Sequence, residues 1–175
     1  MIEVNIQLHW GPRAEELEAL VQKSVEYLAV VTGLGPSFDT WVQPGKSRKS
    51  TLASPVIDPT DSEEIRKLLL KGRNWTDLAP KTVIPELGYH FRLWNRTAGN
   101  VDSTLSIRCG AYSEFLSRDA QNLLNFSASV TAGETLLLDD GAIERAFLVS
   151  AAIWAPHGGR SWTRRGDAEY TIAAI

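Results

Sequence analysis

The segment Gly45-Lys46-Ser47 carries residue types that could hold a phosphate. Nucleotide-binding loops that end in Gly-Lys-Ser or Gly-Lys-Thr carry another glycine five residues before the glycine of that tripeptide, so that the backbone can wrap the phosphate. Position 40 is Thr40 here, and Pro44 removes an amide donor just before Gly45. No helix signal follows, since residues 48–55 are polar and end in proline. We therefore interpret the segment as a solvated basic loop and expect no bound nucleotide.

Metal and nucleophile chemistry find little support in the spacing of the histidines and the cysteine. His9, His90 and His157 have no second ligand at helical or hairpin spacing, so no metal site is predicted. Cys109 falls on the apolar side of a predicted strand over residues 104–109, which indicates a buried, unreactive thiol. As the only cysteine, it also excludes an intrachain disulfide and a cysteine-based zinc site.

Adjacent carboxylates occur at Asp139-Asp140 and at Glu63-Glu64. Neighbouring side chains on a helix point in different directions, so neither pair suits a general acid and base working together. Both suit helix starts. The nucleophile pattern Gly-x-Ser-x-Gly is absent as well. We expect a protein that is not an enzyme and uses no cofactor; a small hydrolase or nucleotide-binding enzyme is the alternative.

Four acids surround one predicted helix start: Asp58, Asp61, Glu63 and Glu64. They form either a solvated face that complements the helix dipole or a docking patch for a basic partner. On the second interpretation, changing Asp61, Glu63 and Glu64 to lysine should slow association with the partner. It should also leave the melting temperature nearly unchanged.

Hydrophobic periodicity and turn residues predict the elements that would position these groups. Strands are expected over residues 2–8, 38–42, 88–94, 104–109 and 122–130. Helices are expected from Pro12 or Arg13 to Gly33, from the capping pattern of residues 60–63 to Gly72, and from Ala142 to about Ile153. Loops are expected over residues 43–59, 74–86 and 158–166. Consecutive central strands favour an α+β fold, with a mainly antiparallel sheet of about five strands and about three helices.

Length and charge limit the function classes. The 175 residues suit one domain over 1–175, in which 156–175 form a loop and an edge strand or a frayed tail. The net charge of −3 favours neither nucleic acid nor a membrane as partner. The first residues lack the features of a signal peptide, and no apolar run approaches the length of a membrane span, so cytoplasmic localisation is expected.

A set of short motifs then occurs in order along the chain: Phe38-x-x-Trp41, Gly45-x-Ser47-Arg48, Leu69-x-x-Gly72-Arg73-Asn74-x-x-Asp77, Ile84-Pro85-Glu86-Leu87-Gly88-Tyr89, Trp94-Asn95 and Cys109-Gly110-Ala111-Tyr112-Ser113. The ordered set resembles the bacterial immunity protein 52 family over roughly residues 1–156. The resemblance implies an α+β antitoxin of a polymorphic toxin system, encoded beside its toxin. It further implies that the toxin is a nuclease of restriction-endonuclease-like fold, delivered by contact-dependent secretion such as type VI, and that it is blocked by tight one-to-one binding.

The partner is therefore expected to be a cognate toxin protein, with a multi-partner adaptor as a further alternative. Motifs shared by antitoxins of different toxins are better explained by the fold than by the interface, so we place the contacts on loops and charged helix starts. Tryptophan, of which the chain has six, is enriched at binding hot spots. The candidate partner-binding residues are Trp41, Arg48, Asp58, Asp61, Glu63, Glu64, Trp75 and Asp77.

Overall fold

The computed structural model describes residues 2–95, 101–113, 121–130 and 139–175. Its strands are β1 (Ile2–Trp10), β2 (Trp41–Val42), β3 (Val56–Ile57), β4 (Tyr89–Asn95), β5 (Val101–Cys109), β6 (Asn122–Val130), β7 (Gly158–Arg165) and β8 (Ala168–Ala174). Its helices are α1 (Leu17–Thr32), α2 (Arg48–Leu52), α3 (Ser62–Lys71) and α4 (Asp140–Trp154), with short 3-10 turns η1 (Pro36–Phe38) and η2 (Pro85–Leu87).

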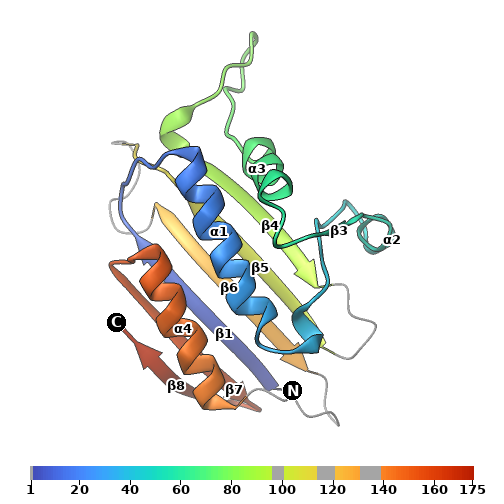
Figure 1. Ribbon diagram of the computed structural model, residues 1–175, viewed down its shortest axis with the longest axis vertical. Helices are drawn as coiled ribbons and strands as arrows, with labels where there is room; N and C mark the ends of the chain where they lie inside the picture. The colour runs from blue at the N-terminus through green and yellow to red at the C-terminus, as the bar shows by residue number, and fades with distance from the viewer. Residues whose placement is uncertain (1, 96–100, 114–120, 131–138) are drawn as a thin grey trace.

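The strands form one antiparallel sheet in the order β3-β2-β4-β5-β6-β1-β7-β8. Helices α1, α3 and α4 lie across one face of this sheet, whereas α2 lies to one side, beyond β3 (Figure 1). The predicted α+β class is confirmed. The expected strand number is wrong, because the described residues form eight strands rather than about five. They also form four helices rather than about three.

Alternation along the strands explains why the helices lie on one face only. In β1, Val4, Ile6, Leu8 and Trp10 are buried against the helices. The intervening side chains of β1 are polar and face the other way. Leu105, Ile107 and Cys109 of β5 repeat the pattern, as do Leu124, Phe126 and Ala128 of β6. These apolar faces join the buried stripes of the helices in one core cluster.

Helix α1 begins later than its sequence suggests. Pro12 or Arg13 was expected to open it, yet the first helical residue is Leu17. The backbone N–H of Arg13 instead donates to the carbonyl oxygen of Ala111. The Arg13 guanidinium donates to the carbonyls of Trp154 and Ala155, over 2.7 and 3.2 Å, at the end of α4. Arg13 thus satisfies the last carbonyls of another helix, which local pattern could not reveal.

The predicted loop over residues 158–166 is mostly strand. Residues Gly158–Arg165 pair antiparallel with β1 on one side and with β8 on the other. Glycine and arginine made the segment look irregular, but a Cβ at Gly159 would lie 2.5 Å from the carbonyl oxygen of Gln7. Glycine here permits the close approach of two strands. The final residues form the edge strand β8.

The predicted loop over residues 43–59 contains the five-residue helix α2 and strand β3. Ser47 caps α2 by accepting from the Ser50 N–H, so the expectation that no helix follows Ser47 is wrong. The helix does not turn the segment into a phosphate loop, since the amide of Gly45 donates to Thr51 Oγ1 over 2.8 Å.

Within the described ranges, no helix is both long and apolar enough to cross a membrane.

Candidate functional site

The helix-free face of the sheet carries two Arg-x-Trp pairs, Arg92 with Trp94 on β4 and Arg160 with Trp162 on β7. Three strands separate them, in the order β5, β6 and β1. Register aligns the arginines in one cross-strand row and the tryptophans in the next. We call this area, with the strands between the two pairs, the trough.

Small polar side chains form the floor of the trough. Between the arginines lie Ser106, Asn125 and Gln7, and between the tryptophans lie Thr104, Ser127 and Asn5. Because the floor residues are smaller than the arginines and tryptophans at the rims, the face is hollowed, and the hollow has a volume of about 460 Å³. Such a surface offers hydrogen-bond donors and acceptors between two aromatic and cationic rims.

The two rims differ in how their charges are used. Arg160 stacks over the Trp162 ring at 4.3 Å from its centroid and forms an ion pair with Glu169 over 3.2 Å. Arg92 is exposed, and it forms no hydrogen bond or ion pair with any residue that the structure describes. The adjacent Trp94 is anchored, since its Nε1 donates to Asp102 over 2.5 Å. The β4 rim therefore presents an unneutralised positive charge beside a fixed indole.

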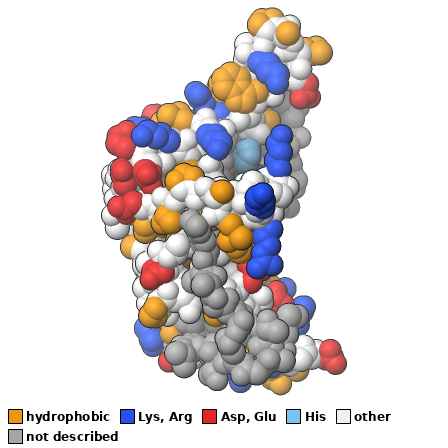
Figure 2. Space-filling model, turned by 90° about the vertical axis from the view of Figure 1, so that its right-hand side faces the viewer, with side chains coloured by type: hydrophobic (Ala, Val, Ile, Leu, Met, Phe, Trp, Pro, Cys, Tyr) orange, Lys and Arg blue, Asp and Glu red, His pale blue; other side chains and the backbone are white. Residues whose placement is uncertain are grey.

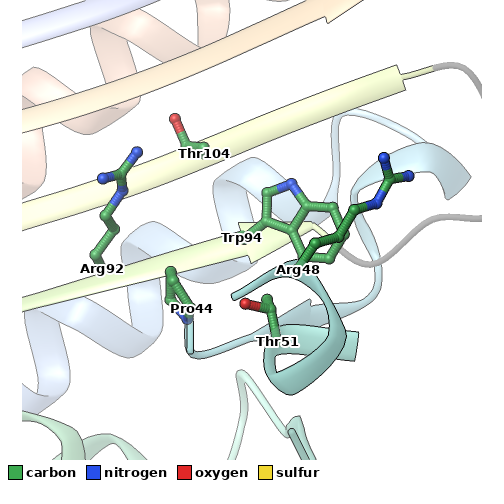
Figure 3. Close-up of a pocket in the computed structure, with 6 residues that line it drawn as sticks. All are labelled: Pro44, Arg48, Thr51, Arg92, Trp94 and Thr104. Carbon is green, nitrogen blue, oxygen red and sulfur yellow. The ribbon is translucent and has the colours of Figure 1, made fainter. Parts of the chain in front are cut away.

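Helix α2 extends the β4 rim outward, and we count its residue Arg48 as part of the trough from here on. A second hollow of about 240 Å³ is lined by Pro44, Arg48, Thr51, Arg92, Trp94 and Thr104 (Figure 3). Arg48 lies beside the Trp94 indole, and Arg92 reaches into the same area from β4 (Figure 3). Arg92 also lines a third hollow, with Leu68, Lys71 and His90 among its neighbours. Arg92 is thus the cation shared by three adjoining hollows.

A second surface is the arm formed by residues 73–84, which projects from the body between α3 and β4 (Figure 1). Its two sides are tied together, because the Thr76 N–H donates to the Thr82 carbonyl and the Ile84 N–H to the Asn74 carbonyl. The side chains of Trp75 and Leu78 are 45% and 81% exposed. The arm therefore presents apolar side chains on a hydrogen-bonded support.

The acids around the start of α3 gather on the side away from the row of Lys and Arg side chains (Figure 2). Asp61 caps the helix by accepting from the N–H groups of Glu63 and Glu64. Asp58 accepts from the backbone N–H and the hydroxyl of Thr60, and these bonds lower its pKa. Glu64 accepts from the Asp58 N–H, and Glu63 pairs with Arg66. All four carboxylates therefore already stabilise local structure.

The structure separates the eight predicted contact residues into three surfaces and the core. Arg48 joins the trough, Trp75 and Asp77 lie on the arm, and the four acids lie at the start of α3. Trp41 differs, because it is fully buried and its Nε1 donates to the Phe38 carbonyl over 2.8 Å. A partner cannot touch Trp41 in this conformation, so we remove it from the contact set.

Sequence reasoning missed Arg92, Trp94 and Trp162. A usable signal was present, since Arg-x-Trp occurs in residues 92–94 and 160–162, as it also does in residues 73–75 on the arm. In a strand, that spacing places both side chains on one face. Residues 160–162 lie in the segment 158–166, for which the sequence predicts a loop and therefore no common face.

The residues considered for catalysis lie apart. His90 is exposed on the helix-free face, whereas Cys109 is fully buried on the helix side. Burial raises the pKa of the Cys109 thiol, which disfavours the nucleophilic thiolate. The imidazole Nδ1 of His157 is 3.2 Å from the Gly11 amide and accepts from it. In the described part of the chain, no three His, Cys, Asp or Glu side chains cluster as metal ligands would.

Comparison with known families adds a finding that geometry alone does not provide. The sequence model of immunity protein 52 matches residues 6–159, from within β1 to the beginning of β7. The chain matches no curated protein. The matched region includes the arm, α3 and the β4 rim, whereas Arg160 and Trp162 lie just beyond it. Since the match covers most of the chain, the protein belongs to the immunity protein 52 family.

Proposed function

We propose that this protein neutralises a cognate bacterial toxin by binding it, and that the toxin is a nuclease of restriction-endonuclease-like fold. The toxin would be an effector of a type VI or another polymorphic toxin system. Family membership over residues 6–159 is the observation that carries the proposal. Immunity proteins act by binding, so the expected role is stoichiometric inhibition in the cytoplasm of the producing cell rather than catalysis.

The surfaces of the molecule are suited to such binding. The trough and the arm both present tryptophan next to arginine, and these two residue types dominate binding hot spots. In the arm, the Arg73 guanidinium lies 5.4 Å from the centroid of the Trp75 ring. Preorganised aromatic side chains lose little conformational freedom on binding, which favours high affinity. We propose a one-to-one complex with a Kd of about 1 nM or below.

Co-expression with the product of the neighbouring gene tests the proposal. We expect the toxin alone to stop growth, the pair to restore it, and the two proteins to co-purify at equal molar amounts. A catalytically inactive toxin variant then allows the Kd to be measured with purified proteins. If the pair neither restores growth nor co-purifies, the proposal fails.

The manner of inhibition can be tested in the same system. We propose that the immunity protein covers the nuclease active site. The inactive toxin should then lose binding to labelled DNA when one equivalent of the immunity protein is added. A stable ternary complex of toxin, DNA and immunity protein would instead show inhibition from a distance.

A further inference from the structure

We propose that the trough binds an acidic segment of the cognate toxin, with Arg92 and Arg48 pairing with its carboxylates and Trp94 and Trp162 packing against its chain. This inference rests on the proposed function and names the surface and the chemistry of its partner. The occupant is a protein segment that carries Asp or Glu side chains.

Charge complementarity is the first argument. Arg92 and Arg48 are exposed, and neither pairs with another described residue. Elsewhere on the same sheet face, Arg164 pairs with Glu169 over 2.9 Å and lies 3.7 Å from Glu3. The face thus neutralises its β7 arginines internally and leaves the β4 rim cationic. A planar guanidinium favours carboxylate as a partner, because two parallel hydrogen bonds can form.

The floor provides the second argument. Asn5, Asn125, Ser106 and Thr104 line the hollow of about 460 Å³ and offer both donors and acceptors. The exposed face of a sheet usually carries polar side chains. Here two large aromatic side chains, Trp94 and Trp162, border the polar floor, and both are only half-buried. Indole rings next to a polar floor suit a peptide chain, which has alternating apolar and polar parts.

A single-stranded nucleic acid would also find aromatic and cationic groups here. The protein as a whole has a net charge of −3, and of the two trough arginines on β4 and β7, Arg160 is paired with Glu169. Proteins that bind single-stranded nucleic acid use a continuous row of cationic side chains along the phosphate backbone. The trough has Glu3, Asp102 and Glu169 along one end instead, so we favour an acidic protein segment.

The test uses the purified full-length chain, the inactive toxin from the neighbouring gene, and calorimetry or biolayer interferometry. We expect Arg92→Glu to weaken binding at least about 30-fold, since the reversal replaces an attractive charge pair with a repulsive one. Arg92→Lys should weaken it by about 5- to 10-fold, because the charge remains but the bidentate geometry is lost. Arg145→Glu is the matched control, as Arg145 is exposed on α4 at the other face of the sheet, and it should bind like wild type.

Thermal melts separate docking from folding. Arg92 is exposed, so the melting temperature of Arg92→Glu should match that of wild type within about 2 °C. If the wild type binds the toxin and Arg92→Glu binds it with the same affinity, the inference about the trough is overturned and the proposed function remains intact. Failure of the wild type to bind the toxin would remove both.

Photo-crosslinking identifies the occupant. A benzophenone amino acid in place of Thr104 on the trough floor should crosslink to a toxin peptide that contains Asp or Glu. Crosslinks only to peptides without carboxylates would overturn the proposal. A final experiment measures the binding of a labelled single-stranded RNA of mixed sequence to the wild type and to Arg92→Glu. RNA binding that Arg92→Glu abolishes, together with unchanged toxin binding, would assign the trough to nucleic acid instead.

Discussion

At the scale of single residues, the core contains a tyrosine hydroxyl for which the described residues provide no hydrogen bond. Tyr27 on α1 is fully buried, and no residue in the described ranges hydrogen-bonds its hydroxyl. Burial raises the pKa of this phenol above its ordinary value of 10.0. A buried polar group without a partner loses its hydration and gains nothing in return. Tyr27 therefore contributes through its ring, while its hydroxyl reduces stability.

Replacing Tyr27 with phenylalanine should leave stability unchanged or raise it by about 1 kcal/mol at neutral pH. The pH dependence follows from the raised pKa. Above the ordinary pKa of 10.0, Tyr27 ionises in the unfolded chain, whereas burial opposes its ionisation in the folded chain. The ionisation of Tyr27 therefore does not lower the free energy of unfolding below that pH, and it lowers it increasingly above that pH. Tyr27→Phe should show a smaller decline in urea midpoint between about pH 8 and pH 11. Tyr170→Phe, at a 55% exposed position, is the control. A lower midpoint for Tyr27→Phe at neutral pH would show that the hydroxyl has a partner after all.

At the scale of elements, the start of α3 shows that one cluster can serve structure and binding together. We expected that reversing Asp61, Glu63 and Glu64 to lysine would leave the melting temperature nearly unchanged. The structure leads to a different expectation, because Asp61 accepts from two N–H groups at the helix start. Loss of such a cap costs about 1 kcal/mol, and three lysines would also oppose the helix dipole. The triple lysine variant would confuse unfolding with loss of docking.

A better test removes the charges and keeps the acceptors. Asn caps a helix as well as Asp, and Gln keeps an acceptor oxygen in place of the glutamate carboxylate. We expect the variant D61N/E63Q/E64Q to lose less than about 0.5 kcal/mol of stability. If the acids dock a basic part of the toxin, this variant should associate at least about threefold more slowly than wild type, as stopped-flow fluorescence would show. Unchanged association kinetics would remove the acids from the interface.

The arm over residues 73–84 separates binding from stability more clearly, since the Leu78 side chain is 81% exposed. We expect Leu78→Ala and Trp75→Ala to change the urea midpoint little, and to weaken toxin binding by about 10-fold if the arm enters the interface. Leu148→Ala is the matched control, because Leu148 on α4 is 50% exposed. Toxin affinities within about twofold of wild type for both arm variants would show that the arm lies outside the complex.

At the scale of the whole molecule, local pattern predicted what depends on neighbours in sequence. The alternation in residues 2–8 and 122–130 and the buried stripe of α1 follow from periods of 2 and 3.6 residues, and these elements are present. Strand β7 could not be predicted in this way. Its partner β1 lies about 150 residues earlier, and its glycine is explained only by the carbonyl of Gln7 beside it.

The candidate site was even less accessible to sequence reasoning. Arg48 was identified because it lies in a basic loop, but the trough exists only through sheet register. The order of strands places Arg92 of β4 and Trp162 of β7 on opposite rims of one hollow. The Arg-x-Trp spacing places each pair on one face of its strand, but it does not show that β4 and β7 belong to the same hollow. Side-chain pairing also decides the outcome, since Arg164 is neutralised by Glu3 and Glu169, while Arg92 has no such partner among the residues that the structure describes.

The distribution of charge over the whole molecule leads to a final prediction. Acids gather at the start of α3, whereas Arg48 and Arg92 line a hollow on the other candidate surface, so the two surfaces would attract toxin surfaces of opposite sign. Figure 2 shows acidic and basic side chains gathered on different sides of the face in view. Salt screens either attraction, so raising NaCl from about 50 mM to about 500 mM should slow toxin association by about tenfold. Dissociation should change much less.

The variants reveal which surface steers the encounter. If the trough does so, Arg92→Glu should slow association at low salt and flatten its salt dependence, whereas D61N/E63Q/E64Q should leave both unchanged. If the acids at α3 steer it, the reverse holds. Association rates that are insensitive to salt in the wild type would mean that neither charged surface guides the toxin. The apolar tip of the arm, with Leu78 and Trp75, would then become the primary contact to examine.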